Sequence, residues 1–174
     1  MSHEISRIVS AAANGVWAID TGKAQQIAAM LALRANNEPS AEFEQQPQAA
    51  LRETLATDEG TVHVLRLHGT IFPRANVLSE FSGGVSLVQF QQAFQQAAQD
   101  TSASAIILDV DSPGGMVDFV PETAAMIQAA RNAERPIIAV ANPLAASAAY
   151  WLASQADEVL VTPSGAVGSI GVYM

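Results

Sequence analysis

The pattern of apolar and polar residues changes along the chain, and from residue 61 onward it predicts strands that alternate with helices. Residues 62–67 alternate between apolar and polar side chains, as a strand with one buried face does. Over 87–99 the apolar residues recur at helical spacing, behind a serine (Ser86) that opens a capping box. The same periods predict strands at 61–67, 106–110, 137–141 and 158–161, and helices at 87–99, 119–132 and 147–155. This alternation predicts an α/β fold with a parallel sheet and right-handed crossovers.

The first sixty residues follow a different pattern, which predicts an appendage in front of the sheet. Apolar stripes at helical spacing predict helices within 5–12 and 27–34. Residues 36–48 contain two prolines and many Glu and Gln residues, which is typical of a linker, and 49–56 is predicted to be a short helix. We therefore expect a helical leader over 1–35, a linker with a short helix over 36–60, and a core over 61–174.

Ser147 lies where a predicted strand ends and a predicted helix begins, in a run of small residues. A strand that turns sharply into a helix presents a hydroxyl above the sheet, with the first amides of the helix behind it. Those amides favour a developing negative charge, and small neighbours let a substrate carbonyl approach. Ser147 is therefore a candidate nucleophile; a tightly packed helix start is the alternative for this segment alone.

A second turn follows the predicted strand 106–110, where the sequence is Asp-Ser-Pro-Gly-Gly. Pro113 stiffens this turn, and its two glycines allow backbone amides to point outward. Because the carboxyl ends of neighbouring parallel strands meet at one edge of a sheet, we expect an oxyanion hole around Ser147 made by Gly114, Gly115 and Ala148. Such an arrangement performs acyl transfer. An ordinary turn is the alternative if this motif is taken alone.

These two segments, with the stretch Thr-Pro-Ser-Gly-Ala-Val-Gly-Ser-Ile-Gly-Val at 162–172, resemble peptidase family S49 in kind and order. The family includes signal peptide peptidase A and the capsid assembly proteases of tailed phages, and the resemblance covers roughly residues 62–174. It implies the ClpP/crotonase-like spiral fold, a serine–lysine dyad and no cofactor. Alanines at 148 and 149 stand where the membrane-bound peptidases usually have glycines, which favours the phage branch. Its members carry a short helical leader, which implies docking to neighbours or covering the site; a plain packing extension is the alternative.

The lysine that the resemblance implies as general base is missing. In the family it lies well downstream of the Gly-Ser-Ile-Gly stretch, whereas the one lysine here, Lys23, lies upstream at no matching position. A serine hydroxyl is a poor nucleophile until a base accepts its proton, so we expect very weak activity from these residues alone. We expect the chain to be the front part of a longer polypeptide; a natural end, with the base supplied by another subunit, is the alternative.

Histidine is the other base that a serine nucleophile uses. ClpP-type proteases, which share the spiral fold, use a triad whose histidine follows the serine, and no histidine follows Ser147 here. Of His3, His63 and His68, only His68 is considered as a base, because it ends the predicted strand at 61–67. A partly exposed structural histidine is the alternative and is expected more often.

Ser169, Ser154 and the pair Asp109 and Asp111 are the remaining polar residues that could belong to a site. The resemblance implies that Ser169, in the Gly-Ser-Ile-Gly stretch, supports the dyad; the alternative is an ordinary serine in a glycine-rich turn. Ser154 is expected to pack against the sheet or cap its helix. Asp109 and Asp111 flank the predicted turn, and because no ligand cluster lies nearby in the sequence we assign no metal.

Composition restricts the partners and the compartment. The 17 acidic and 8 basic side chains leave a formal net charge of −9, which disfavours nucleic acid and anionic membranes as partners. The absence of cysteine gives no support for an oxidising compartment. No apolar run approaches the ~20 residues of a spanning helix. We expect a cytoplasmic protein of a bacterial host cell, encoded by a phage or prophage, with no membrane anchor.

Taken together, these features predict a serine endopeptidase. The resemblance to family S49 implies that it is of the Ser-Lys dyad type, processes phage capsid or scaffold proteins and forms a homo-oligomer. Two alternatives remain open at this point. One is a non-catalytic capsid-assembly module, and the other is a crotonase-type acyl-CoA enzyme, which needs no serine nucleophile. The apolar segment 71–84 has no clear period and is either a wall of the peptide groove or a surface loop.

Overall fold

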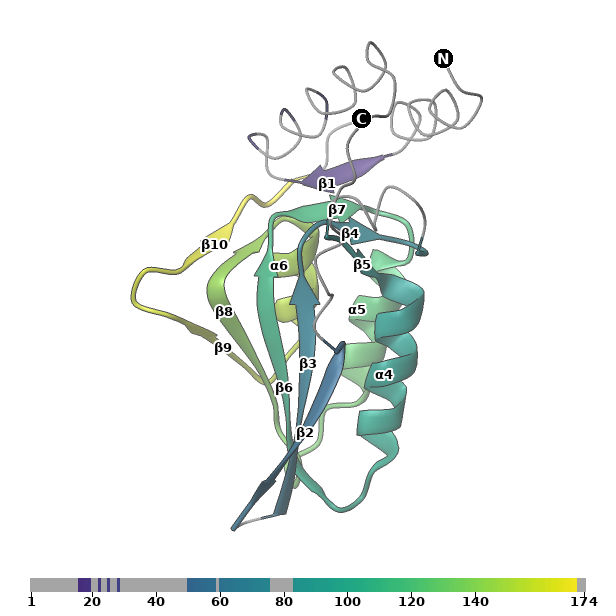
Figure 1. Ribbon diagram of the computed structural model, residues 1–174, viewed down its shortest axis with the longest axis vertical. Helices are drawn as coiled ribbons and strands as arrows, with labels where there is room; N and C mark the ends of the chain where they lie inside the picture. The colour runs from purple at the N-terminus through teal and green to yellow at the C-terminus, as the bar shows by residue number, and fades with distance from the viewer. Residues whose placement is uncertain are drawn as a thin grey trace, which may run out of the picture.

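The computed structural model describes residues 16–19, 50–58, 60–75 and 83–171, together with the single residues 22, 25 and 28. Within them the chain forms two sheets and, where helix bounds are described, three helices, an α/β arrangement whose larger sheet is mostly parallel, as predicted (Figure 1).

The larger sheet has the strand order β10-β8-β6-β3-β2, with β9 beside β8. Its central strands β3, β6 and β8 run parallel, β9 and β10 both pair in parallel with β8, and β2 pairs antiparallel with β3. The strands are β2 (Arg52–Thr57), β3 (Gly60–His68), β6 (Ala103–Ser112), β8 (Ile137–Ala146), β9 (Glu158–Val161) and β10 (Ala166–Gly168).

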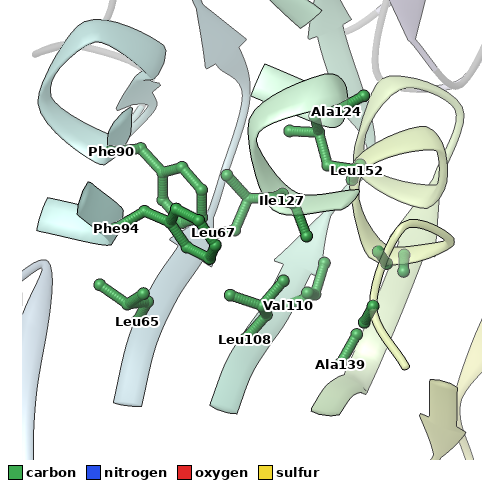
Figure 2. Packing of buried hydrophobic residues seen from close by; sticks show 14 of the residues in the cluster. Leu65, Leu67, Phe90, Phe94, Leu108, Val110, Ala124, Ile127, Ala139 and Leu152 are labelled. Carbon is green, nitrogen blue, oxygen red and sulfur yellow. The ribbon is translucent and has the colours of Figure 1, made fainter. Parts of the chain in front are cut away.

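Helices α4 (Leu87–Gln99), α5 (Val120–Ala129) and α6 (Ala148–Ala153) cover one face of this sheet (Figure 1). Alternate residues of the strands point at the helices and are fully buried, because the side-chain period of a strand is two. Figure 2 shows the resulting core, with Leu65, Leu67, Leu108 and Val110 on the strands and Phe90, Phe94, Ile127 and Leu152 on the helices. Burying one such side chain contributes about 1.5–3 kcal/mol, so this core holds the helices on the sheet.

The smaller sheet has the order β1-β7-β4-β5. Its strands are very short: β1 (Trp17–Ile19), β4 (Ile71–Phe72), β5 (Val85–Ser86) and β7 (Gly114–Met116). It lies across the end of the larger sheet at which β3, β6 and β8 finish (Figure 1). The turn predicted after residue 110 is thus the point where β6 passes from the larger sheet into β7 of the smaller one.

Most predicted elements beyond residue 61 are confirmed, with shifts of a few residues at their ends. The capping serine is also confirmed, since the Ser86 hydroxyl accepts a hydrogen bond from the Gln89 amide at 3.4 Å. The predicted helix at 49–56 is wrong, because Arg52–Thr57 is strand β2. Every side chain of β2 is exposed, so backbone pairing with β3 decides its conformation and no burial period reveals it.

Part of the predicted leader lies outside the described residues. This holds for the helix within 5–12 and the linker at 36–48; within 27–34 only Ala28 is described, and it is helical. The segment 71–84 begins with β4, whose two residues are fully buried, so its start is an inner strand of the smaller sheet.

Candidate active site around Ser147

Ser147 occupies a sharp turn between β8 and α6, with φ 55 and ψ −118. An L residue rarely adopts a positive φ, and such a conformation costs about 1–3 kcal/mol unless the surroundings impose it. Two backbone hydrogen bonds do so: the Ser147 amide donates to the Gly168 carbonyl at 2.8 Å, and its carbonyl accepts from the Trp151 amide at 2.9 Å. Strained strand-to-helix turns of this kind present nucleophiles in α/β enzymes.

Ser147 is 7% exposed, and its hydroxyl makes one weak hydrogen bond among the described contacts. Its hydroxyl donates to the Gly171 carbonyl at 3.4 Å, which is long for an O–H···O bond. The flanking Ala146 and Ala148 are buried and small, so neither of these two side chains screens the hydroxyl. A weakly bonded hydroxyl beside small residues suits attack on a carbonyl carbon.

Gly114 lies directly against Ser147. β6 and β8 pair with Ser112 opposite Ala145, which brings the end of β6 beside the turn at Ser147. A Cβ atom added to Gly114 would lie 3.0 Å from the Ser147 Cβ and 2.3 Å from the carbonyl oxygen of Ala18. With its φ of 95, this position accepts only glycine, and the two turns predicted to converge lie side by side.

Ser112 is a residue that the sequence analysis missed. It is fully buried, and its hydroxyl donates to the Gly69 carbonyl at 2.6 Å and accepts from the Gly114 amide at 3.2 Å. It therefore fixes the turn after β6 to the end of β3. The sequence did contain a signal for this role, namely a serine just before Pro-Gly-Gly. A serine hydroxyl commonly forms a hydrogen bond with the backbone of the residue two positions further along the chain.

The three predicted oxyanion donors have different surroundings. Ala148 is buried and opens α6, so its amide has no acceptor within the helix. The Gly114 amide donates to Ser112. Gly115 stands opposite Ala18 in the antiparallel pair of β7 with β1.

The Gly115 amide is directed at β1. The Val117 amide donates to the Val16 carbonyl at 3.0 Å, and hydrogen-bonded pairs alternate along an antiparallel ladder. The next hydrogen-bonded pair is therefore Ala18 with Gly115, which places the Gly115 amide on the Ala18 carbonyl.

The segment 168–171 borders Ser147 on another side, through the carbonyls of Gly168 and Gly171. Ser169 lies between them, exposed and with a positive φ of 54. Ile170 beside it is 85% exposed. The structure thus brings Ser169 into the neighbourhood of Ser147 without a hydrogen bond between their hydroxyls among the described contacts.

Neither described histidine bonds to Ser147. His68 contacts Asp109, with 3.0 Å between Nε2 and Oδ2, and the amide of Asn142 donates to the same carboxylate at 3.5 Å. Since Leu67 points into the core, His68 points to the opposite face of the sheet.

His63 has a structural role and lies in the half of β3 that is remote from Ser147. It is buried, its Nδ1 contacts the Thr54 hydroxyl at 3.1 Å, and its Nε2 contacts the Asp100 carboxylate at 2.8 Å. Hydrogen bonds from Ser102, and a further one from His63, lower the pKa of Asp100 to about 2. This network ties β2, β3 and the end of α4 together.

In the part of the chain that the structure describes, no three His, Cys, Asp or Glu residues lie together in a way that would hold a metal ion. Among the described helices, none has the length and apolar character needed to cross a membrane. An open hollow of about 650 Å³ lies between β1 and α5, lined among others by Val16, Arg74, Phe119 and Glu122, but Ser147 is not part of it.

Sequence comparison shows which known proteins the chain is similar to. The sequence pattern of peptidase family S49 matches residues 129–174, which include Ser147. The chain is 39% identical over 113 residues to capsid assembly protease C of Escherichia phage lambda, covering 65% of this chain and 26% of that protein. It is 37% identical over 113 residues to head-tail preconnector protein GP5 of Enterobacteria phage P21, covering 65% and 22%. It is 31% identical over 121 residues to Protease 4 of Salmonella typhi, covering 70% and 19%. The chain therefore spans only about a quarter of these relatives, or less.

Among solved structures, the chain is similar to a protein assigned as an enoyl-CoA hydratase from Streptomyces coelicolor A3(2). The TM-score is 0.46 at 18% identity, and the match covers 75% of this chain and 52% of that one.

Proposed function

Because the chain belongs to peptidase family S49, we propose that it acts as a serine endopeptidase with Ser147 as the nucleophile. The observation that carries the proposal is the position of Ser147, held at positive φ between β8 and α6 with Gly114 against its Cβ. Both residues belong to the motifs on which the family resemblance rests.

In the proposed reaction the Ser147 hydroxyl oxygen bonds to the carbonyl carbon of the scissile peptide, and its proton passes to a base. The negative charge moves to the carbonyl oxygen, where the amides of Ala148 and Gly115 stabilise it, while the Gly114 amide stays bonded to Ser112. The amine then leaves with the proton from the base, and water hydrolyses the acyl ester on Ser147. Losing one such amide donor lowers kcat by about 10²–10³ in serine proteases.

The base of the proposed dyad is not assigned to a residue of this sequence. The resemblance implies a lysine, and Lys23, the one lysine present, matches no family position and lies outside the described residues. Histidine is the alternative type of base, and in the described part His68 is already paired with Asp109. The arrangement around Ser147 therefore supports the nucleophile and oxyanion side of the mechanism.

For the substrate we propose polypeptides of phage head assembly, since two relatives are named as a capsid assembly protease and a head-tail preconnector protein. The resemblance also implies a homo-oligomer, which stays a prediction here.

A fluorophosphonate probe tests the proposed nucleophile. We expect the natural protein to gain one covalent adduct, located at Ser147 by mass spectrometry, and to lose it in Ser147→Ala. Ser154→Ala is the matched control, because Ser154 is an exposed serine at the end of the same helix. Its hydroxyl bonds only to neighbours in the chain: it donates to the Trp151 carbonyl at 2.8 Å and accepts from the Gln155 side-chain amide at 3.0 Å. Labelling that persists in Ser147→Ala would overturn the assignment. Tight binding of coenzyme A by the unlabelled protein would instead favour the acyl-CoA enzyme.

A further inference from the structure

We propose that β1 occupies the place of the substrate peptide in this structure, so that the chain covers its own active site with residues Trp17–Ile19. The inference rests on the proposed function, because it takes Ser147 as the point to which the substrate must come. When β1 leaves, an extended substrate strand takes its place on β7.

The first observation is the pairing of β7. Its two edges are both filled, one by β4 and the other by β1, in the order β1-β7-β4. An extended peptide commonly binds a sheet by adding a strand to a free edge. β4 is fully buried within the smaller sheet, so the edge that a peptide can reach is the one that β1 holds.

The second observation is the position of the Ala18 carbonyl. Both the Ala18 oxygen and the Ser147 Cβ lie within 3.0 Å of the point that a Gly114 side chain would fill. The alternation of the ladder directs the Gly115 amide to this same oxygen. A carbonyl of the chain itself therefore engages an amide that the proposed mechanism reserves for the substrate.

The third observation is the burial of β1. Ala18 is 2% exposed and Ile19 is 4% exposed. Trp17 packs edge-on against Phe72 of β4, with 6.0 Å between the ring centres. β1 is thus buried in the way that a bound peptide strand would be. Its small residue, Ala18, lies opposite Gly115 of β7, and the large apolar residues Trp17 and Ile19 flank it.

These contacts also describe the substrate. Ala18 stands opposite Gly115 and is 2% exposed, so its side chain is enclosed on all sides. A peptide that replaces β1 needs a small residue in the place of Ala18 and apolar residues beside it. We therefore infer an extended peptide with a bulky-small-bulky apolar sequence.

A reversible crosslink tests whether β1 must leave. Trp17 faces Met116 at a non-hydrogen-bonded position of the ladder, where Cα atoms are about 4.5 Å apart, a distance that a disulfide spans. The sequence has no cysteine, so Trp17→Cys with Met116→Cys introduces the one possible pair. The probe is a fluorescein-labelled peptide Val-Trp-Ala-Ile-Asp, whose binding is measured by fluorescence polarisation.

We expect the reduced double variant to bind the peptide at least tenfold more tightly than the oxidised one. The same protein serves as its own control, since only the crosslink differs. Equal binding in the two states would overturn the inference.

A second variant removes the need for a crosslink. Ala18→Pro deletes the amide by which β1 pairs with β7, and proline is not tolerated at such a position. We expect faster hydrogen exchange at the Gly115 and Val117 amides and tighter binding of the labelled peptide. Val16→Ala is the control, because it shortens an exposed side chain and leaves every backbone donor in place. Exposed amides in Ala18→Pro without any gain in peptide binding would overturn the inference.

Both measurements are made in a Ser147→Ala background as well. Peptide binding and hydrogen exchange do not need a reactive hydroxyl, so they report on β1 alone. Failure of Ser147 to take up the fluorophosphonate would sink the proposed function, while these two measurements would still decide the place of β1.

Discussion

Gly114 is the residue at which three parts of the site meet. It lies against Ser147 on one side and against the carbonyl of Ala18 on another, with its own amide bonded to the buried Ser112. Its φ of 95 is available to glycine at no steric cost. The position of the nucleophile thus depends on a residue that has no side chain.

Replacing Gly114 separates backbone strain from crowding. In Gly114→Ala the new Cβ would stand 2.3 Å from the Ala18 oxygen and 3.0 Å from the Ser147 Cβ, so β1 or Ser147 must shift. We expect unfolding to become easier by about 1–3 kcal/mol, the usual cost of a strained backbone position. We also expect fluorophosphonate labelling of Ser147 to slow by about tenfold or more, measured by intact-mass kinetics.

Gly83→Ala is the matched control for this prediction. Gly83 also has a positive φ, of 64, but an added Cβ meets nothing within 4 Å among the described residues. It should lose stability through strain alone and keep its labelling rate. An equal loss of labelling in both variants would contradict the role given to Gly114.

At the scale of elements, sequence patterns predicted the strands and helices that bury one face of their own side chains. Strand β6 and helix α4 carry such faces, and both were found where periodicity placed them. Strand β2 has no buried side chain, and β1 and β7 have three residues each, too few to show a period. These elements exist because a distant strand offers backbone partners, which no local pattern records.

The same distinction applies to the site. Ser147 and Gly114 stand in local motifs, and the motifs were enough to single them out. The pairing of β1 with β7 joins residues about a hundred positions apart, and its closeness to Ser147 follows only from the assembled sheets.

The network at the end of α4 makes the stability of this element depend on pH. The hydrogen bonds from Ser102 and His63 lower the pKa of Asp100 to about 2 from 3.8. Because the folded pKa lies below the unfolded one, the stabilisation is present above about pH 4 and is lost as the pH falls toward 2. We expect Asp100→Asn to lower the thermal unfolding midpoint at pH 6 and to match the wild-type protein near pH 2.

Asp118→Asn, at an exposed aspartate, is the control for this prediction. A constant difference in unfolding midpoint between Asp100→Asn and wild type from pH 6 to pH 2 would contradict the prediction.

At the scale of the whole molecule, the larger sheet ends at an apolar edge. β9 and β10 both lie on the side of β8 that faces away from β6, opposite to the edge formed by β2 (Figure 1). Leu160, Val161 and Val167 on these strands are 45%, 44% and 43% exposed. Sheet edges with exposed apolar side chains are places where other chains add on. This edge is therefore where we expect the predicted homo-oligomer to form contacts.

Charge placed on this edge tests that expectation. In Leu160→Lys with Val167→Lys, an ammonium group must be buried wherever the edge contacts another chain, which costs several kcal/mol if the charge has no partner. We expect the variant to sediment at a lower mass than the wild-type protein at equal concentration, with an unchanged circular dichroism spectrum. Glu158→Lys is the matched control, since it adds a lysine to the same strand at an exposed polar position and removes no apolar side chain. If the double variant and the control sediment alike, the assembly contacts lie elsewhere, because an interface through β9 and β10 cannot accept two buried charges without weakening.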